Sequence, residues 1–205
     1  MEEETSRLIF MTISCLIMAM ALSACCGFKV FVPPLLLGIF AKAGLISLGE
    51  NYAWLGSWPA IAVLSLATAL ETAAYFIPLV NNALDSIKIP ASTMAGVLTA
   101  AAVLPGEMSP LLRWTLAVLI GGGGAAAVST GMASLRGTLT MTTAGIGSGL
   151  QNLAEAILSF LLSIFAMLAP FLLCLAILLV LLSVIRRLCR RNAAHRQEAI
   201  SFPPE

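Results

Sequence analysis

The stretch LATALETAAYFIP, residues 66–78, places a single carboxylate inside an apolar run. Between residues 60 and 80, Glu71 is the only ionisable side chain apart from the phenol of Tyr75. A spanning helix needs about 20 apolar residues, so Glu71 falls near the middle of such a span. A charge at that depth costs from about 3 to more than about 10 kcal/mol. Glu71 is therefore a buried neutral hydrogen-bond donor, part of an ion or proton site, or a residue nearer an interface.

The composition of the whole chain places this run in a membrane. The 205 residues are 60% hydrophobic and 10% charged, and their mean hydropathy is +0.99. A soluble domain carries about 25% charged residues, so this chain has too little polar surface to cover a water-facing globule. We expect an all-α, polytopic helical membrane protein that forms a single membrane domain over residues 1–205.

Apolar runs and their interruptions predict about five crossings. We expect helices at residues 8–26, 54–80, 90–104, 111–127 and 150–185, with a polar loop at 81–88 and a turn at 105–110. Two broken or re-entrant segments are predicted at 27–38 and 128–149, because prolines remove backbone donors and glycines are weak helix formers. The residues assigned to these breaks are Gly27, Pro33, Pro34, Gly121, Gly122, Gly123, Gly124, Gly145 and Gly147.

The two halves of the chain resemble inverted repeats. Superposing Pro78 on Pro170 places Gly27 close to the glycine run at 121–124, so residues 8–80 and 110–186 form two halves joined by a linker helix at 90–104. Two crossings in each half and one in the linker place the two termini on opposite sides. Inverted repeats with discontinuous helices are a recurring plan of transporters.

The distribution of basic residues predicts the orientation. Five of the eleven Lys and Arg lie in the last twenty residues, namely Arg186, Arg187, Arg190, Arg191 and Arg196. Basic residues that flank a span stay in the cytoplasm, so we expect residues 187–205 to form a cytoplasmic tail and the N-terminus to lie outside. Lys29 and Lys42 fall on the cytoplasmic side, in agreement, whereas Arg136 falls towards the outside and does not agree.

The reactive side chains predict no catalytic, metal or cofactor site. Cys15, Cys25, Cys26, Cys174 and Cys189 lack metal-ligand spacing with His195, the only histidine, and no serine has the histidine and acid of a hydrolase. LSAC, which ends at Cys25, is like a lipoprotein cleavage box. However, MEEETSR is not the positive start of a signal peptide, so we expect 8–26 to be a retained helix. We expect no enzyme activity and no nucleic-acid partner.

Polar residues near the predicted spans are candidates for an ion or solute path: Glu71, Glu155, Asn152, Asn81, Asn82 and Asp85. Asn152 and Glu155 can share a helix face because they are three residues apart. Glu155 can instead be a helix N-terminal acid that interacts with the dipole, and Asn81, Asn82 and Asp85 a solvated loop with Asx turns.

We expect the Glu71 side chain to face the protein interior, near the second broken segment. There it can accept hydrogen bonds from Thr138, Thr140, Thr142 or Thr143, or from backbone groups freed by the glycines. Glu71 and Glu155 can then line one cavity from the two halves. The glycine-rich segments either expose backbone groups to a permeant species or allow close helix packing.

Several longer strings carry a family resemblance, in this order: GFKVFVPPLLLG, ETAAYFIPLVNNALDSIKIPASTMAG, MSPLLRWTLAVLIGGGGAAA and TTAGIGSG. Over about residues 24–180 the chain resembles a family of multi-pass bacterial membrane proteins known as domain of unknown function 4126. An acid often stands in that family where this chain has Asn81, and Asn-Pro where it has Ser148-Gly149. The resemblance implies a bacterial inner-membrane protein and implies no activity.

Two functions fit these residues. The first is a small transporter or channel for an ion or small solute, with buried acids that face a central path. The alternative is a membrane scaffold or assembly protein whose buried acids hold helices together. In either case we expect contact with the lipid bilayer, and a homo-oligomer can form through helix faces of small residues.

Overall fold

The computed structural model of the chain describes residues 2–74, 78–143 and 151–168, and all of the long regular elements in this part are helices. Side chains at 78–86 and 139–143 lie outside the description. The chain divides into two compact units, residues 1–169 and 170–205. The fold described below is that of the first unit.

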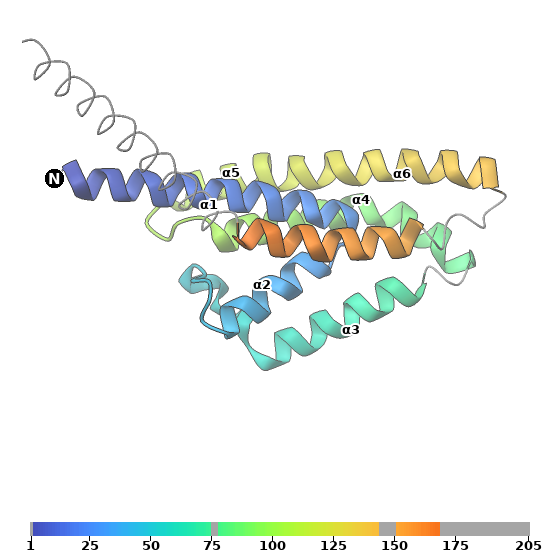
Figure 1. Cartoon of the computed structure of the whole chain (residues 1–205), viewed down its shortest axis with the longest axis horizontal. Helices are drawn as coiled ribbons and strands as arrows, with labels where there is room; N and C mark the ends of the chain where they lie inside the picture. Colours follow the sequence, from blue (N-terminus) through green and yellow to red (C-terminus); the bar gives the residue numbers. More distant parts are fainter. Residues whose placement is uncertain (1, 75–77, 144–150, 169–205) are drawn as a thin grey trace, which may run out of the picture. The chain divides into compact units, whose positions relative to one another are not determined.

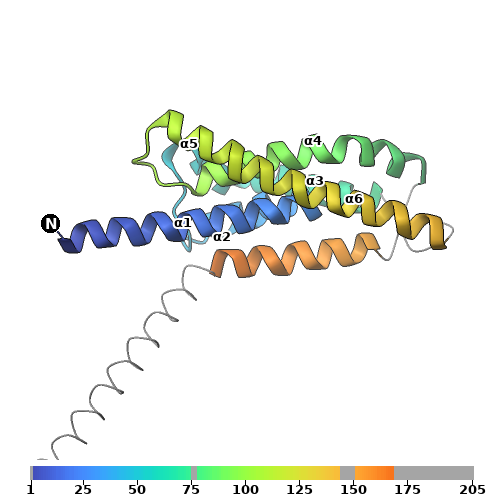
Figure 2. The ribbon, with the colours of Figure 1, turned by 90° about the horizontal axis from the view of Figure 1, so that it is seen from above.

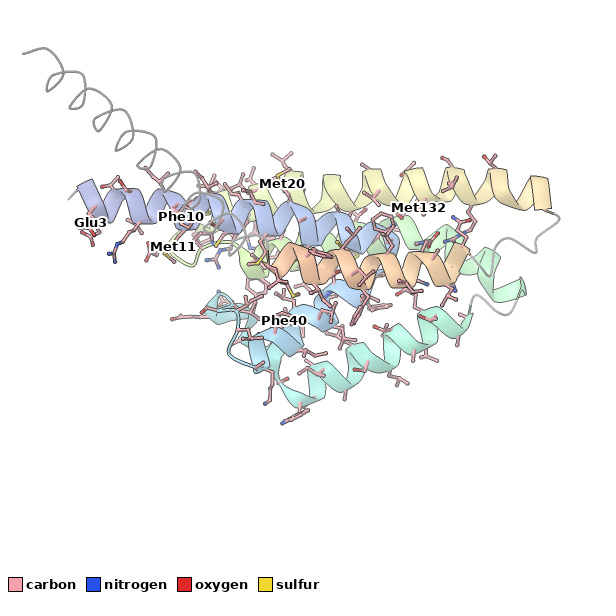
Figure 3. The ribbon with its side chains drawn as sticks, in the orientation of Figure 1. Glu3, Phe10, Met11, Met20, Phe40 and Met132 are labelled. Atoms are coloured by element: carbon pink, nitrogen blue, oxygen red, sulfur yellow. The ribbon has the colours of Figure 1, made fainter. Side chains whose placement is uncertain are left out.

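Several helices of this unit have the length and apolar surface of membrane spans. Three pass both criteria in the described residues, Glu3–Phe28, Pro110–Thr138 and Gln151–Leu168. A fourth arises if the 3-10 helix η1 (Glu50–Gly56) and α3 (Trp58–Ala74), bent by 63°, form one span. Large apolar side chains such as Met11 and Met20 are exposed on the outer surface (Figure 3). In the described residues the prediction of a helical protein with several membrane spans is confirmed, with three or four candidate spans.

The centre of the unit is formed by α1 (Glu2–Phe28), α4 (Pro78–Val103) and α6 (Gly123–Thr143), which contact one another (Figures 1 and 2). Glycines allow two helix contacts to be close: that of α4 with η2 (Ala117–Gly122), the segment before α6, and that of α1 with α6. A methyl group on Gly121 would lie 2.5 Å from the carbonyl oxygen of Gly96, and one on Gly27 would lie 2.6 Å from Cβ of Val128. The structure thus uses these glycines for helix packing, the second of the two roles considered above.

The first predicted break is present, but it is shorter than expected. Helix α1 ends at Phe28 and α2 (Val32–Lys42) begins at Val32, so only residues 29–31 are non-helical. Pro33 and Pro34 lie in the first turn of α2, where a backbone donor is not needed and proline is favoured. Gly38 does not interrupt α2 and instead lies close to the carbonyl oxygen of Leu55. The prolines therefore start a helix rather than breaking one.

The second predicted break is wrong for residues 128–143, which belong to the continuous helix α6. The glycine run does not end the preceding helix either: α5 (Pro110–Leu116) continues through a π-helical segment, η2 (Ala117–Gly122), into α6. The hydroxyls of Ser134 and Thr138 donate to carbonyls four residues earlier, which makes these small polar residues compatible with a helix. Gly145 and Gly147 lie outside the described residues.

The polar loop predicted at 81–88 is also wrong. Helix α4 includes this segment and continues through Pro90 to Val103, so the expected linker helix is the second part of a longer helix. Asn and Asp have weak helix propensity, but tertiary packing overrides such preferences, and Lys88 at the end of the segment is buried. The turn predicted at 105–110 is confirmed, because α4 ends at Val103 and α5 begins at Pro110.

The start of α1 and the end of helix Gln151–Leu168 lie at the same end of the helices in both views, together with the loop between α4 and α5 (Figures 1 and 2). This follows because α2 turns back from the end of α1, so that α1 and α3 run in the same direction (Figure 1). The five crossings predicted from the sequence place the two termini on opposite sides of the membrane. The last predicted helix extends to residue 185, and its part beyond Leu168 lies outside the described residues.

Candidate functional site: a buried charge network

Glu71 lies on α3 and faces the protein interior, as predicted, with 7% of its side chain exposed. Its Oε1 accepts a hydrogen bond from the backbone N–H of Val30 at 3.0 Å, and its Oε2 accepts one from Phe31 at 3.3 Å. The break between α1 and α2 leaves these donors without helical partners. The carboxylate thus satisfies the backbone at the first break, rather than the second.

The hydrogen-bond partners of Glu71 in the described residues are backbone N–H groups rather than the expected threonines. Thr138 is exposed on α6 and its hydroxyl donates to the carbonyl of Ser134. The side chains of Thr140, Thr142 and Thr143 lie outside the described part of the chain. Glu71 binds the first break because α3 packs against α2.

Glu155 is the centre of a second set of interactions. It lies in helix Gln151–Leu168 with 1% of its side chain exposed. Lys88 of α4 donates to its Oε2 at 2.8 Å, and Nη2 of Arg136 from α6 lies 2.6 Å from both carboxylate oxygens. Gln151, one turn earlier, donates to Oε1 at 3.0 Å. Glu155 therefore links three helices through charge-assisted hydrogen bonds, which are the strong class.

Lys29 and Asn152 connect the two acids. Lys29, fully buried in the break after α1, donates from Nζ to Oδ1 of Asn152 and interacts electrostatically with both Glu71 and Glu155. Asn152 in turn donates from Nδ2 to the carbonyl of Thr72 at 3.4 Å. We call seven side chains the charge network. Hydrogen bonds join Lys29 to Asn152, and Lys88, Arg136 and Gln151 to Glu155, while the charge of Lys29 attracts both Glu155 and Glu71. The members are therefore Lys29, Glu71, Lys88, Arg136, Gln151, Asn152 and Glu155.

The charge network lies inside the bundle and far from the end of α4. Residues 88–103 separate Lys88 from that end, which at 1.5 Å per residue corresponds to about 22 Å along the helix. Desolvation of buried ions costs several kcal/mol each, so removal of one partner is strongly destabilising.

Two of the predicted path residues, Asn152 and Glu155, share one buried helix face, as expected from their spacing. Glu155 and Glu71 belong to one network. The side chains of Asn81, Asn82 and Asp85 lie outside the description, although their backbone belongs to α4. The placement of these three along a path stays a prediction.

Sequence reasoning missed the basic members of the network. Lys29 and Arg136 served as markers of membrane orientation, and Lys88 was assigned to a loop, but all three are buried. A buried base carries no information about which side a loop faces, so neither the agreement of Lys29 nor the disagreement of Arg136 tests the predicted orientation. The available signal was the one that identified Glu71, namely an isolated charge among apolar or small residues.

The helical bundle and its buried charges define a class, the multi-pass membrane proteins with a charged interior. Residues 16–191 match the family described as Domain of unknown function (DUF4126), and the chain belongs to this family. The resemblance seen in the sequence is thereby confirmed. No curated protein and no solved structure matches the chain.

Proposed function

We propose that this protein is a small membrane transporter or channel for an ion or small solute, and that the charge network is the polar part of its path. One observation carries the proposal: Glu155 is buried between two basic side chains from different helices, in a bundle whose helices include candidate membrane spans. Ionisable groups inside a membrane are expensive and commonly mark ion or substrate pathways.

Within the network, Glu155 rather than Glu71 is our candidate for the residue that exchanges partners during transport. Both oxygens of Glu71 accept backbone N–H groups, which can leave only if the start of α2 moves. The partners of Glu155 are long side chains, which can change rotamer while the helices stay in place. The Oε1 of Gln151 beside it is buried and has no donor among the described residues, so a hydrated ion can donate to it.

Two helix irregularities, one of which borders the network, support a moving part. Residues 29–31 separate α1 from α2, and the π-helical segment η2 interrupts the α-helical pattern between α5 and α6. Broken helices are common at transporter sites, and π-segments occur frequently at functional sites. Inverted repeats are not part of this proposal, since α6 has no break within 128–143.

We further propose that the protein resides in a bacterial inner membrane with the basic tail at 187–205 in the cytoplasm. The argument is the arginine cluster after residue 185, because such clusters remain on the cytoplasmic side. The family resemblance described above supports the same location.

A scaffold or assembly role is the second candidate, and the contacts of Glu71 favour it. A carboxylate whose two oxygens hold a helix start has a structural task that needs no permeant species. In this alternative the charge network fixes the arrangement of the helices, and the chain moves no solute.

Flux into proteoliposomes separates the two functions. The purified chain is reconstituted and assayed against protons, alkali cations, halides and small organic ions. Transport predicts flux of at least one species that is abolished by Glu155→Gln and retained by Glu4→Gln, an exposed control. No flux of any species from a folded wild-type protein contradicts transport and supports the scaffold.

A further inference from the structure

A second polar site lies where α4 leads into α5, away from the charge network. Its centre is Arg113, which is 8% exposed. Nη2 of Arg113 donates to the carbonyl of Pro105 at 2.7 Å, while the buried Nε has no partner among the described residues. A guanidinium carries five N–H donors and keeps its charge at any physiological pH. Arg113 therefore presents a buried positive charge whose donors are mostly unused.

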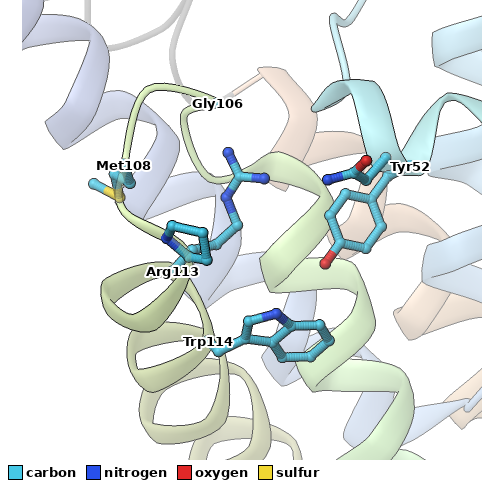
Figure 4. Close-up of a pocket in the computed structure, with 7 residues that line it drawn as sticks. Tyr52, Gly106, Met108, Arg113 and Trp114 are labelled. Atoms are coloured by element: carbon cyan, nitrogen blue, oxygen red, sulfur yellow. The ribbon is translucent and has the colours of Figure 1, made fainter.

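Two adjoining cavities, of about 470 and 410 Å³, meet at this side chain and share Asn51 and Gly106. The first has apolar and aromatic walls made by Tyr52, Met108, Pro110 and Trp114. In Figure 4 the guanidinium lies between the loop at Gly106 and the ring of Tyr52. The second cavity is lined by two carboxylates, Glu50 and Glu107. One basic group thus separates an apolar compartment from an acidic one.

We propose that this site binds the headgroup of a phospholipid that carries a primary ammonium on its phosphodiester, the chemistry of phosphoethanolamine. Arg113 binds the phosphate, because a planar guanidinium matches phosphate oxygens with paired donors. Glu50 and Glu107 accept hydrogen bonds from the ammonium group. The apolar cavity takes the glycerol and the first acyl carbons.

The acidic residues decide between headgroups. A headgroup that carries only negative charge is repelled by the carboxylates of Glu50 and Glu107. A quaternary ammonium has no N–H to donate to them. The primary ammonium matches both, and Trp114 at the site is a residue type enriched where lipid headgroups lie.

The same ammonium phosphodiester exists free in water as glycerophosphoethanolamine. The apolar cavity beside Arg113 favours the lipid, because the soluble compound leaves those walls uncovered. The site and its test are independent of transport, since none of its residues belongs to the charge network.

The experiment is calorimetric titration of the full chain in detergent micelles. The ligands are dihexanoyl phosphatidylethanolamine, its choline and glycerol counterparts, and glycerophosphoethanolamine. We expect at least about tenfold tighter binding of the ethanolamine lipid than of the choline or glycerol lipid, which corresponds to about 1.4 kcal/mol. Arg113→Gln should abolish this binding, whereas Arg7→Gln, which removes an exposed arginine, should leave it unchanged.

A double variant, Glu50→Gln with Glu107→Gln, keeps the test decisive if Arg113→Gln does not fold, because both acids are exposed. It should remove the preference for ethanolamine over choline. Equal affinity for the three lipids in the wild type, or an unchanged preference in the double variant, overturns the proposal. Equal affinity for the soluble compound supports the headgroup chemistry and identifies the free compound as the source.

Discussion

Glu71 should stabilise the break between α1 and α2, and its removal should weaken the protein there first. Glu71→Leu deprives the N–H groups of Val30 and Phe31 of their acceptors in a buried position. A hydrogen bond to a charged group contributes about 1.5–3 kcal/mol, so two lost bonds destabilise by about 3–6 kcal/mol. Glu71→Gln keeps one acceptor oxygen and should lose about 1–2 kcal/mol.

Two measurements test the role of Glu71. Reversible unfolding in mixed micelles gives the change in stability, with Glu4→Gln as an exposed control expected within about 0.5 kcal/mol of the wild type. Hydrogen exchange at residues 30 and 31 should accelerate in Glu71→Leu more than exchange in α6 does. If Glu71→Leu is as stable as Glu71→Gln, or if exchange at 30 and 31 is unchanged, the capping argument is wrong.

Three further predictions follow from other contacts. Glu155→Leu should destabilise by about 3–5 kcal/mol in the same unfolding assay, because it removes the shared partner of two buried bases; a loss below about 1 kcal/mol would contradict the burial of the pairs. Gly96→Ala should destabilise by about 1–3 kcal/mol, because its methyl group overlaps the facing helix backbone, while Gly131→Ala, with open space around it, should stabilise by about 0.5–1 kcal/mol. Cysteines introduced at Ser6 and Glu107 in a cysteine-free chain should react with an impermeant reagent from the same side of the membrane, and labelling from opposite sides would refute the arrangement of helix ends.

Much of the fold followed from local energetic costs that a sequence displays directly. A lone carboxylate in an apolar run must face inward, and Glu71 does. Two adjacent prolines exclude a helix interior, and a break lies just before Pro33 and Pro34. Helical spacing placed Asn152 and Glu155 on one face because that geometry needs no tertiary information.

The remainder depended on contacts between distant segments. The sequence does not show that Lys88 and Arg136 converge on Glu155, since residues 67 and 19 positions apart meet only in the folded bundle. The polar composition of residues 81–88 predicted a loop. These residues are helical in α4, and Lys88 at their end is buried. In α6, hydroxyls such as that of Ser134 donate to helix carbonyls. The small polar composition therefore predicted a broken segment where the chain is helical. The Arg113 site was missed because its lining comes from η1, the loop between α4 and α5, and the start of α5, which are far apart in the sequence.

The pairing of Glu71 with the break has a consequence for biogenesis. The N–H groups of Val30 and Phe31 leave the ribosome about forty residues before the carboxylate that accepts from them. In lipid, an unsatisfied backbone donor costs several kcal/mol. The nascent α1–α2 pair is therefore unsuited to the bilayer core until α3 has emerged. The first three helices should leave the translocon together as one insertion unit, and a ribosome stalled before residue 71 should hold α2 in a protein-lined or aqueous environment.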